Sequence, residues 1–137
     1  MYLVYQPEGS EEPQRWKYLP KKLMSVEREL LEKLTSRNFS EFTVDVQKGN
    51  SRCRRALLYV YLKRQHPTLK FDDVDFAWDE LTLEHSKGEL QLMREQLTED
   101  SVPPGQLDAV RAKFDEEIAA AFEDPEEEGK AQLPIAG

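Results

Sequence analysis

The apolar run at residues 56–62, Ala-Leu-Leu-Tyr-Val-Tyr-Leu, constrains the fold of this 137-residue chain more than any other feature. Ser51 can cap a helix that contains the run, and Pro67 cannot continue one, so the spacing predicts a helix over residues 51–66. The Tyr-Val-Tyr sequence at 59–61 would also suit a strand, and local propensity alone leaves that alternative open. A helix that is apolar on two sides is either central to a core or shared with a neighbouring subunit.

The two sides of this helix predict different contacts. Leu57 and Val60 share one side and are expected in the core, packed against apolar side chains of the preceding helices, namely Leu31, Leu34 and Phe42. Leu58 and Leu62 lie on the other side and need cover that one small domain does not obviously supply. We therefore expect these two leucines to mediate self-association or to bind a partner.

Shorter patterns predict the elements around this helix. Strand formers at 2–5 and 15–19 flank a stretch of turn residues, which indicates an N-terminal β-hairpin. Helical spacing and capping serines predict helices over 26–35, with Val26 facing inward, and from Ser40 to Gly49. A capped turn is expected to bury Phe71, Val74 and Phe76, and a short helix is expected over 89–97. The fold class is therefore mainly α, a small helical domain with a short N-terminal β-hairpin and a C-terminal amphipathic helix with an acidic tail.

The sequence Val-Pro-Pro-Gly at 102–105 is the clearest break in the chain. It predicts a helical domain with its hairpin over 1–98, and a segment over 99–137 made of an acidic hinge, an amphipathic helix and a disordered tail. One narrow face of that helix carries the apolar residues Leu107, Val110, Phe114, Ile118 and Phe122. Such a face either buries against its own domain or binds a partner, and the hinge and acidic flank leave both open.

Charge is divided between two segments. Residues 99–128 carry eleven acidic and two basic side chains, a net charge of −9, whereas the whole chain carries −8. Residues 46–71 carry seven basic side chains, Arg55 among them, and no acidic one. This basic segment could be a solvated helix face or could receive an acidic partner, either the chain's own tail or another protein. A nucleic-acid footprint is the weakest interpretation, because the acidic chain repels phosphate.

No arrangement typical of an enzyme, cofactor or metal site is found in the sequence. Cys53 is the only cysteine, so no intrachain disulfide can form. His66 and His85 have no ligand partners at metal-binding spacing, and the acidic cluster at 72–80 lacks the central glycine of a calcium loop. The longest apolar run is too short to span a membrane. We expect a cytoplasmic, non-enzymatic binding protein without a cofactor, a metal, a membrane or nucleic acid as partner.

Several short phrases within residues 15–85 carry a family resemblance. They are Trp16-Lys17-Tyr18, Phe39-Ser40-Glu41-Phe42, Lys48-Gly49-Asn50-Ser51, the stretch 55–67, and Phe71-Asp72-Asp73-Val74-Asp75-Phe76. The pattern resembles the tail assembly chaperones of long-tailed bacteriophages, particularly those that infect actinobacteria. This resemblance favours a helix over a strand for residues 51–66.

The resemblance implies that the chain binds the long, apolar, helical tape measure protein and keeps it soluble while the tail tube assembles. It further implies a homo-oligomer that acts in the host cytoplasm and is absent from the mature virion. Two alternatives stay open, namely a structural tail or head–tail component of the virion and a small host-directed regulatory binding protein. The gene that follows this one would separate them, since a very long helical reading frame there favours the chaperone.

Members of such families commonly have a longer form of the same protein, made by a ribosomal frameshift back by one base. Glu128-Gly129-Lys130 can be encoded GAG-GGA-AAA, which contains a heptamer on which both tRNAs can pair again after the slip. We therefore expect the longer frameshifted form to be a partner of this chain. An ordinary solvated tripeptide remains the alternative interpretation of these residues.

Overall fold

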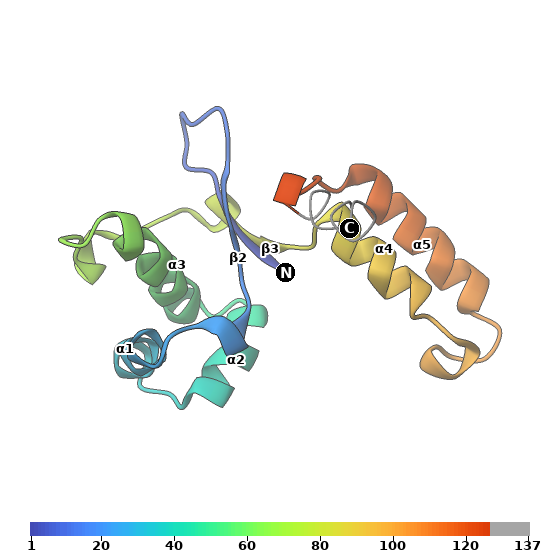
Figure 1. Cartoon of the computed structure of the whole chain (residues 1–137), viewed down its shortest axis with the longest axis horizontal. Helices are drawn as coiled ribbons and strands as arrows, with labels where there is room; N and C mark the ends of the chain where they lie inside the picture. Colours follow the sequence, from blue (N-terminus) through green and yellow to red (C-terminus); the bar gives the residue numbers. More distant parts are fainter. Residues whose placement is uncertain (127–137) are drawn as a thin grey trace, which may run out of the picture. The chain divides into compact units, whose positions relative to one another are not determined.

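The computed structural model describes residues 1–126 and divides the chain into two compact units. Tyr2–Glu84 form one unit, and Met1 together with the described residues 85–126 forms the other (Figure 1). The chain is mainly helical with a small antiparallel sheet, as the sequence predicted. The first unit ends at Glu84, not at residue 98, because the helix after His85 packs against the C-terminal helix and so belongs with it.

The sheet belongs to the Tyr2–Glu84 unit and has the strand order β2-β1-β3, all antiparallel. β1 (Tyr2–Tyr5) and β2 (Gln14–Lys17) form the predicted hairpin. β3 (Leu81–Glu84) pairs with the other edge of β1 and was not predicted. β1 is thus the central strand, and its Leu3, which lies opposite Trp16 on one side and Leu83 on the other, is fully buried.

Three helices follow the hairpin at the positions that the sequence predicted, α1 (Ser25–Thr35), α2 (Phe39–Gln47) and α3 (Ser51–Gln65). The cap of α3 differs, since the side chain of Asn50, not Ser51, accepts the backbone amide of Cys53 at 3.0 Å. Short 3-10 turns connect the elements of this unit: η1 (Pro20–Lys22), η2 (Phe71–Asp73) and η3 (Trp78–Glu80).

One side of α3 packs against α1 and α2. Leu57 and Val60 are buried there, as predicted, together with Leu31 and Phe42. Leu34 is only half-buried. Val26 is 71% exposed and does not face inward as the sequence predicted, because Leu23, just before α1, is the buried residue at that end of the helix.

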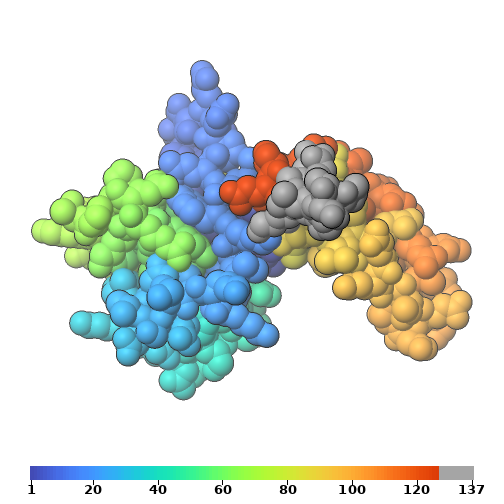
Figure 2. Space-filling model, in the orientation of Figure 1, coloured from blue at the N-terminus to red at the C-terminus, as the bar shows by residue number. Residues whose placement is uncertain are grey.

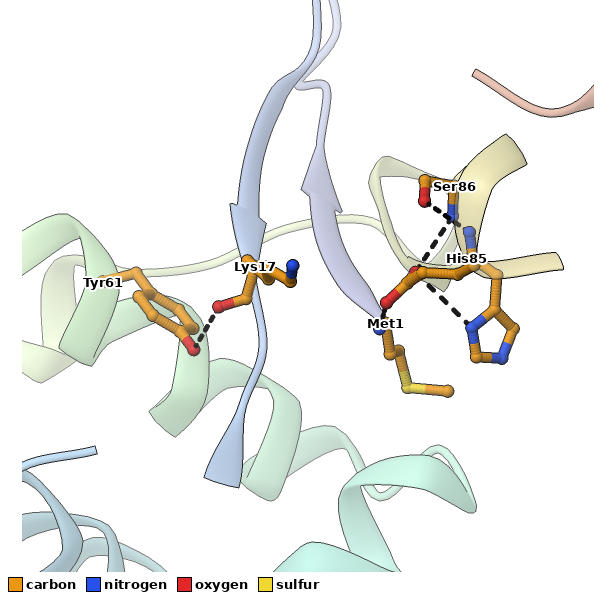
Figure 3. A network of polar contacts seen from close by, with 6 residues as sticks. Met1, Lys17, Tyr61, His85 and Ser86 are labelled. Carbon is orange, nitrogen blue, oxygen red and sulfur yellow. Dashed lines mark hydrogen bonds and ion pairs between the residues drawn. The ribbon is translucent and has the colours of Figure 1, made fainter. Parts of the chain in front are cut away.

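The other side of α3 is covered by the sheet. Leu58 is fully buried, and Tyr61, one turn further along, stacks on Trp16 of β2 with the ring centroids 5.7 Å apart. The Tyr61 hydroxyl donates a hydrogen bond of 3.4 Å to the carbonyl of Lys17 (Figure 3). The prediction of an exposed association face was therefore wrong for Leu58, and Leu62 is half-buried. The Trp16–Tyr61 stack and the Tyr61–Lys17 hydrogen bond attach this side of α3 to β2.

The second unit is a helical hairpin of α4 (Lys87–Glu95) and α5 (Leu107–Ala120). The two helices run antiparallel, since the Lys87 amide at the start of α4 donates to the Phe122 carbonyl just after α5. Arg94 near the end of α4 pairs with Asp115 of α5 at 2.8 Å. The break at Val102-Pro103-Pro104-Gly105 is thus part of the connection between two packed helices and does not separate two domains.

The start of α4 is fixed by a reciprocal cap (Figure 3). The Ser86 hydroxyl accepts the Glu89 amide at 3.1 Å, and the Glu89 carboxylate accepts the Ser86 amide at 3.0 Å. The same carboxylate pairs with the ammonium group of Met1 and lies 3.6 Å from Nδ1 of His85. This cap places the start of α4 at Lys87, two residues before the predicted start at 89.

Leu57→Ala should lower the free energy of unfolding by about 2–5 kcal/mol, because a fully buried leucine is truncated between α1 and α2. Urea denaturation followed by circular dichroism measures this change. Val26→Ala is the matched control, since Val26 is 71% exposed and its truncation should cost about 0.5 kcal/mol or less. Equal losses in the two variants would contradict the assigned register of the helices.

Tyr18→Phe should leave the free energy of unfolding unchanged or raise it. The Tyr18 side chain is 2% exposed, its hydroxyl has no hydrogen-bond partner within the described part of the chain, and burial raises the pKa of that hydroxyl. Removing an unsatisfied buried hydroxyl costs nothing in lost hydrogen bonds. Tyr61→Phe is the control, because it removes the bond to the Lys17 carbonyl and should cost about 0.5 kcal/mol or more. A larger loss for Tyr18→Phe than for Tyr61→Phe would contradict this assignment.

Candidate partner-binding surfaces

The arginines at the start of α3 hold the helices of their own unit together. The Nε–H of Arg52 donates to the Leu34 carbonyl at 2.6 Å, and the Nε–H of Arg54 donates to the Val46 carbonyl at 3.0 Å. Leu34 and Val46 lie in the last turns of α1 and α2, where carbonyls carry partial negative charge, and the Val46 carbonyl also accepts the Gly49 amide at 3.3 Å. These two cations therefore cap the C-termini of the neighbouring helices, a role that the sequence analysis did not foresee.

The other end of α3 is tied to α1 by an ion pair. Both Nε and Nη2 of Arg64 donate to the Glu27 carboxylate, at 2.8 and 2.9 Å. This contact with Arg64 lowers the pKa of Glu27, and the Met24 amide, which donates to the same carboxylate, lowers it further. Much of the basic segment is therefore engaged inside the unit and is not an open cationic face.

Arg55 lies in a different environment from these tethering arginines. Its guanidinium carbon lies 3.9 Å from the centroid of the Phe71 ring, and that of Arg52 lies 5.3 Å from the same centroid. Phe71 is itself held edge-on against Tyr59, at 5.6 Å. Such stacking of a guanidinium on a ring is favourable by about 0.5–2 kcal/mol.

A cavity of about 370 Å³ opens beside this stack, and we call it the Arg55 pocket. It is lined by Ser51, Arg52, Arg55, Asp75, Phe76 and Trp78. The pocket combines two guanidinium groups, two aromatic rings and one carboxylate, all within the Tyr2–Glu84 unit. Arg55 belongs to the basic segment that could receive an acidic partner, but its aromatic surroundings were not predicted from the sequence.

Trp78 is 66% exposed, yet its ring has two defined neighbours, Arg54 and Gly49. The Arg54 guanidinium carbon lies 5.3 Å from the Trp78 ring centroid. Gly49 has a φ of +92°, and a Cβ built there would lie 2.9 Å from Cη2 of Trp78. Only glycine fits this turn without displacing the ring, so the Gly-Asn pair that ends α2 also positions an exposed tryptophan.

The acidic cluster at 72–80 serves local structure. The Glu80 carboxylate accepts the amides of Ala77 and Glu8, each at 2.6 Å, and these bonds, that of Ala77 first, lower its pKa. The Asp75 side chain accepts the amide of Phe76 at 2.9 Å. Within residues 1–126, no group of three or more histidine, cysteine or acidic side chains is arranged to hold a metal ion.

The apolar stripe of α5 lies along α4. Leu107, Val110, Phe114 and Ile118 are half-buried, and Phe122 lies beyond the last helical residue, Ala120. The helices lie side by side along their lengths, as the yellow and orange surfaces in Figure 2 show. The half-buried residues of this stripe thus belong to a helix that packs against α4 within the helical hairpin.

The helical hairpin nevertheless leaves apolar surface open. In the described part of this unit, only Ser86 and Leu90 are buried, and no residue of α5 is. Leu92 and Met93 of α4 are 56% and 37% exposed. Two helices of this length cannot enclose a core, so the hairpin is an incomplete helical bundle.

No protein-family model matches the chain, and neither a curated protein nor a solved structure is detectably similar to it. None of the helices within residues 1–126 has the length and apolarity needed to cross a lipid bilayer. Glu128-Gly129-Lys130 and the predicted disordered tail lie outside the described residues, except for the segment that leads up to residue 126.

Glu27→Gln should lower the free energy of unfolding at pH 7 by about 0.5–1 kcal/mol, a value kept small because Arg64 is 47% exposed. The folded pKa of Glu27 is below its ordinary value of 4.5, so its contribution is present above that pH and is lost as the pH falls through the folded pKa. The wild type and the variant should therefore converge in acid. Denaturant titrations at several pH values measure this.

Glu29→Gln is the matched control for that experiment, because Glu29 is an exposed acidic residue of the same helix. Its variant should follow the wild type at every pH. A constant difference between wild type and Glu27→Gln from neutral to acidic pH would show that the ion pair with Arg64 is not responsible.

Proposed function

We propose that this chain is a tail assembly chaperone of a long-tailed bacteriophage, which binds the helical tape measure protein and keeps it soluble while the tail tube assembles. The proposal has two supports, the short sequence phrases within residues 15–85 and the incomplete helical hairpin of α4 and α5. On this proposal the chain acts in the host cytoplasm, is not an enzyme, and leaves before the virion is mature.

The observation that carries the proposal is the open apolar edge of the hairpin. α4 and α5 bury a single apolar side chain in the described residues, Leu90, while Leu92 and Met93 remain exposed. An amphipathic helix from a partner would complete a three-helix arrangement and cover these residues, which is the usual way in which helices are recognised in grooves. A tape measure protein offers such helices repeatedly along its length.

The acidic flank of the hairpin suits a holding role. Residues 99–128 carry a net charge of −9, so complexes coated by many copies of this chain would repel one another and stay dispersed. Self-association through the same hairpin, or pairing with a longer form of the chain, would use the same open edge. Neither requires Leu58, which is buried in the first unit.

Coexpression with the tape measure protein of the same phage tests this function. The wild-type chain should raise the soluble fraction of the tape measure protein, and the double variant Leu92→Ser, Met93→Ser should lose most of that effect. The double variant Val26→Ser, Val44→Ser is the matched control, because those residues are 71% and 50% exposed on the other unit. It should act as the wild type does.

Two results would refute the proposal in different ways. If the solubility of the tape measure protein does not change when the wild-type chain is coexpressed, the proposed function is wrong. Equal effects of the two double variants would remove the hairpin as its site. Mass spectrometry of purified virions separates the chaperone from a structural tail component, since a chaperone should be absent from the particles.

A further inference from the structure

Arg55 carries a charge that its own unit leaves uncompensated. Its guanidinium has neither a hydrogen bond nor an ion pair with any residue in 1–126, and its Nε is shielded from solvent without a partner. By contrast, Arg37 pairs with Asp45 at 2.8 Å, and Arg64 with Glu27. A half-buried guanidinium without an anion is costly, and a bound carboxylate would relieve that cost.

The surroundings of Arg55 hold its guanidinium ready for such an anion. The Phe71 ring lies against it at 3.9 Å, and Arg52, anchored through Nε to the Leu34 carbonyl, lines the same pocket. Asp75 lines the pocket but forms no ion pair with Arg55 or Arg52, and its carboxylate accepts the Phe76 amide.

The chemistry of the pocket fits a carboxylate better than a phosphate backbone. Asp72, Asp73, Asp75 and Asp79 all lie on the segment that borders the pocket, and all four are exposed. They would repel a nucleic-acid strand with a charge at every nucleotide, whereas a single carboxylate can reach the two arginines between them. Trp78, which is exposed and fixed over Gly49, offers an apolar surface next to the cations.

We propose that the Arg55 pocket binds a peptide segment of a partner protein that carries a single carboxylate, which lies between Arg52 and Arg55, and a neighbouring apolar side chain, which lies against Trp78. This surface lies on the Tyr2–Glu84 unit and does not depend on the apolar edge of the helical hairpin. The chain would thus contact a partner through two chemically different surfaces, one apolar and one cationic.

Fluorescence anisotropy with a labelled, end-blocked peptide of sequence Ser-Phe-Glu-Ser-Leu tests the proposal on the full chain. Binding should weaken as salt rises, and the end-blocked Ser-Phe-Gln-Ser-Leu counterpart should not bind. Arg55→Gln should weaken binding by about tenfold, the loss expected for a charge-assisted hydrogen-bonded contact. Arg28→Gln is the matched control, because it removes the same charge from an exposed site in α1 and should leave binding unchanged.

Asp75→Asn provides a second test that does not risk the fold, since asparagine can still accept the Phe76 amide. Removing this negative charge from the pocket should tighten binding by about two- to threefold. Binding that is unchanged in Arg55→Gln, or equally weakened in Arg28→Gln, would overturn the proposal. So would tighter binding of oligothymidylate than of the peptide, which would assign the pocket to nucleic acid.

Discussion

The fold depends on covering both sides of α3. Its buried residues include Leu57 on the side of α1 and α2 and Leu58 on the side of the sheet, and burying each leucine is favourable by about 1.5–3 kcal/mol. A bundle of three helices alone would leave Leu58 and Tyr61 exposed. The sheet is therefore required by the composition of α3, and the Trp16–Tyr61 stack is where the two layers meet.

The position of α3 also accounts for the arginines beside the core of this unit. Arg52 and Arg54 lie at the start of α3, where a positive charge opposes the helix dipole and is unfavourable for α3 itself. They are placed there because they reach the carboxyl-terminal carbonyls of α1 and α2, whose partial negative charge they neutralise. The unfavourable charge at the N-terminus of α3 is thus offset by favourable contacts at the C-termini of α1 and α2. Arg55 neutralises no helix terminus and has no ion-pair partner among the described residues, so we infer that its charge serves to bind a partner.

The helices were predictable from sequence because their signals are local. Apolar spacing, Pro67 and the Gly49-Asn50 stop are all read within a few residues of each helix. The third strand could not be predicted from sequence in this way. Leu81–Glu84 is only four residues long and becomes a strand by pairing with β1, which lies at the opposite end of the same unit in sequence. The domain boundary was misplaced for a related reason. A Pro-Pro-Gly sequence marks a turn, but whether that turn separates domains depends on packing between α4 and α5.

The candidate sites could be predicted only in part, because they too depend on packing between elements that are distant in sequence. A stripe of apolar residues on α5 is visible in the sequence, but how much of it stays open depends on α4, whose Ser86–Glu89 cap is a local signal that was available and missed. The aromatic walls around Arg55 come from residues 71–78, brought back to the start of α3 by the chain that leads into β3. The first unit thus has a complete core and a preformed pocket, whereas the described part of the helical hairpin lacks such a core. Local opening is governed by buried contacts, so the hairpin is the part whose stability a partner can change most, and the pocket is the part that can select which partner arrives.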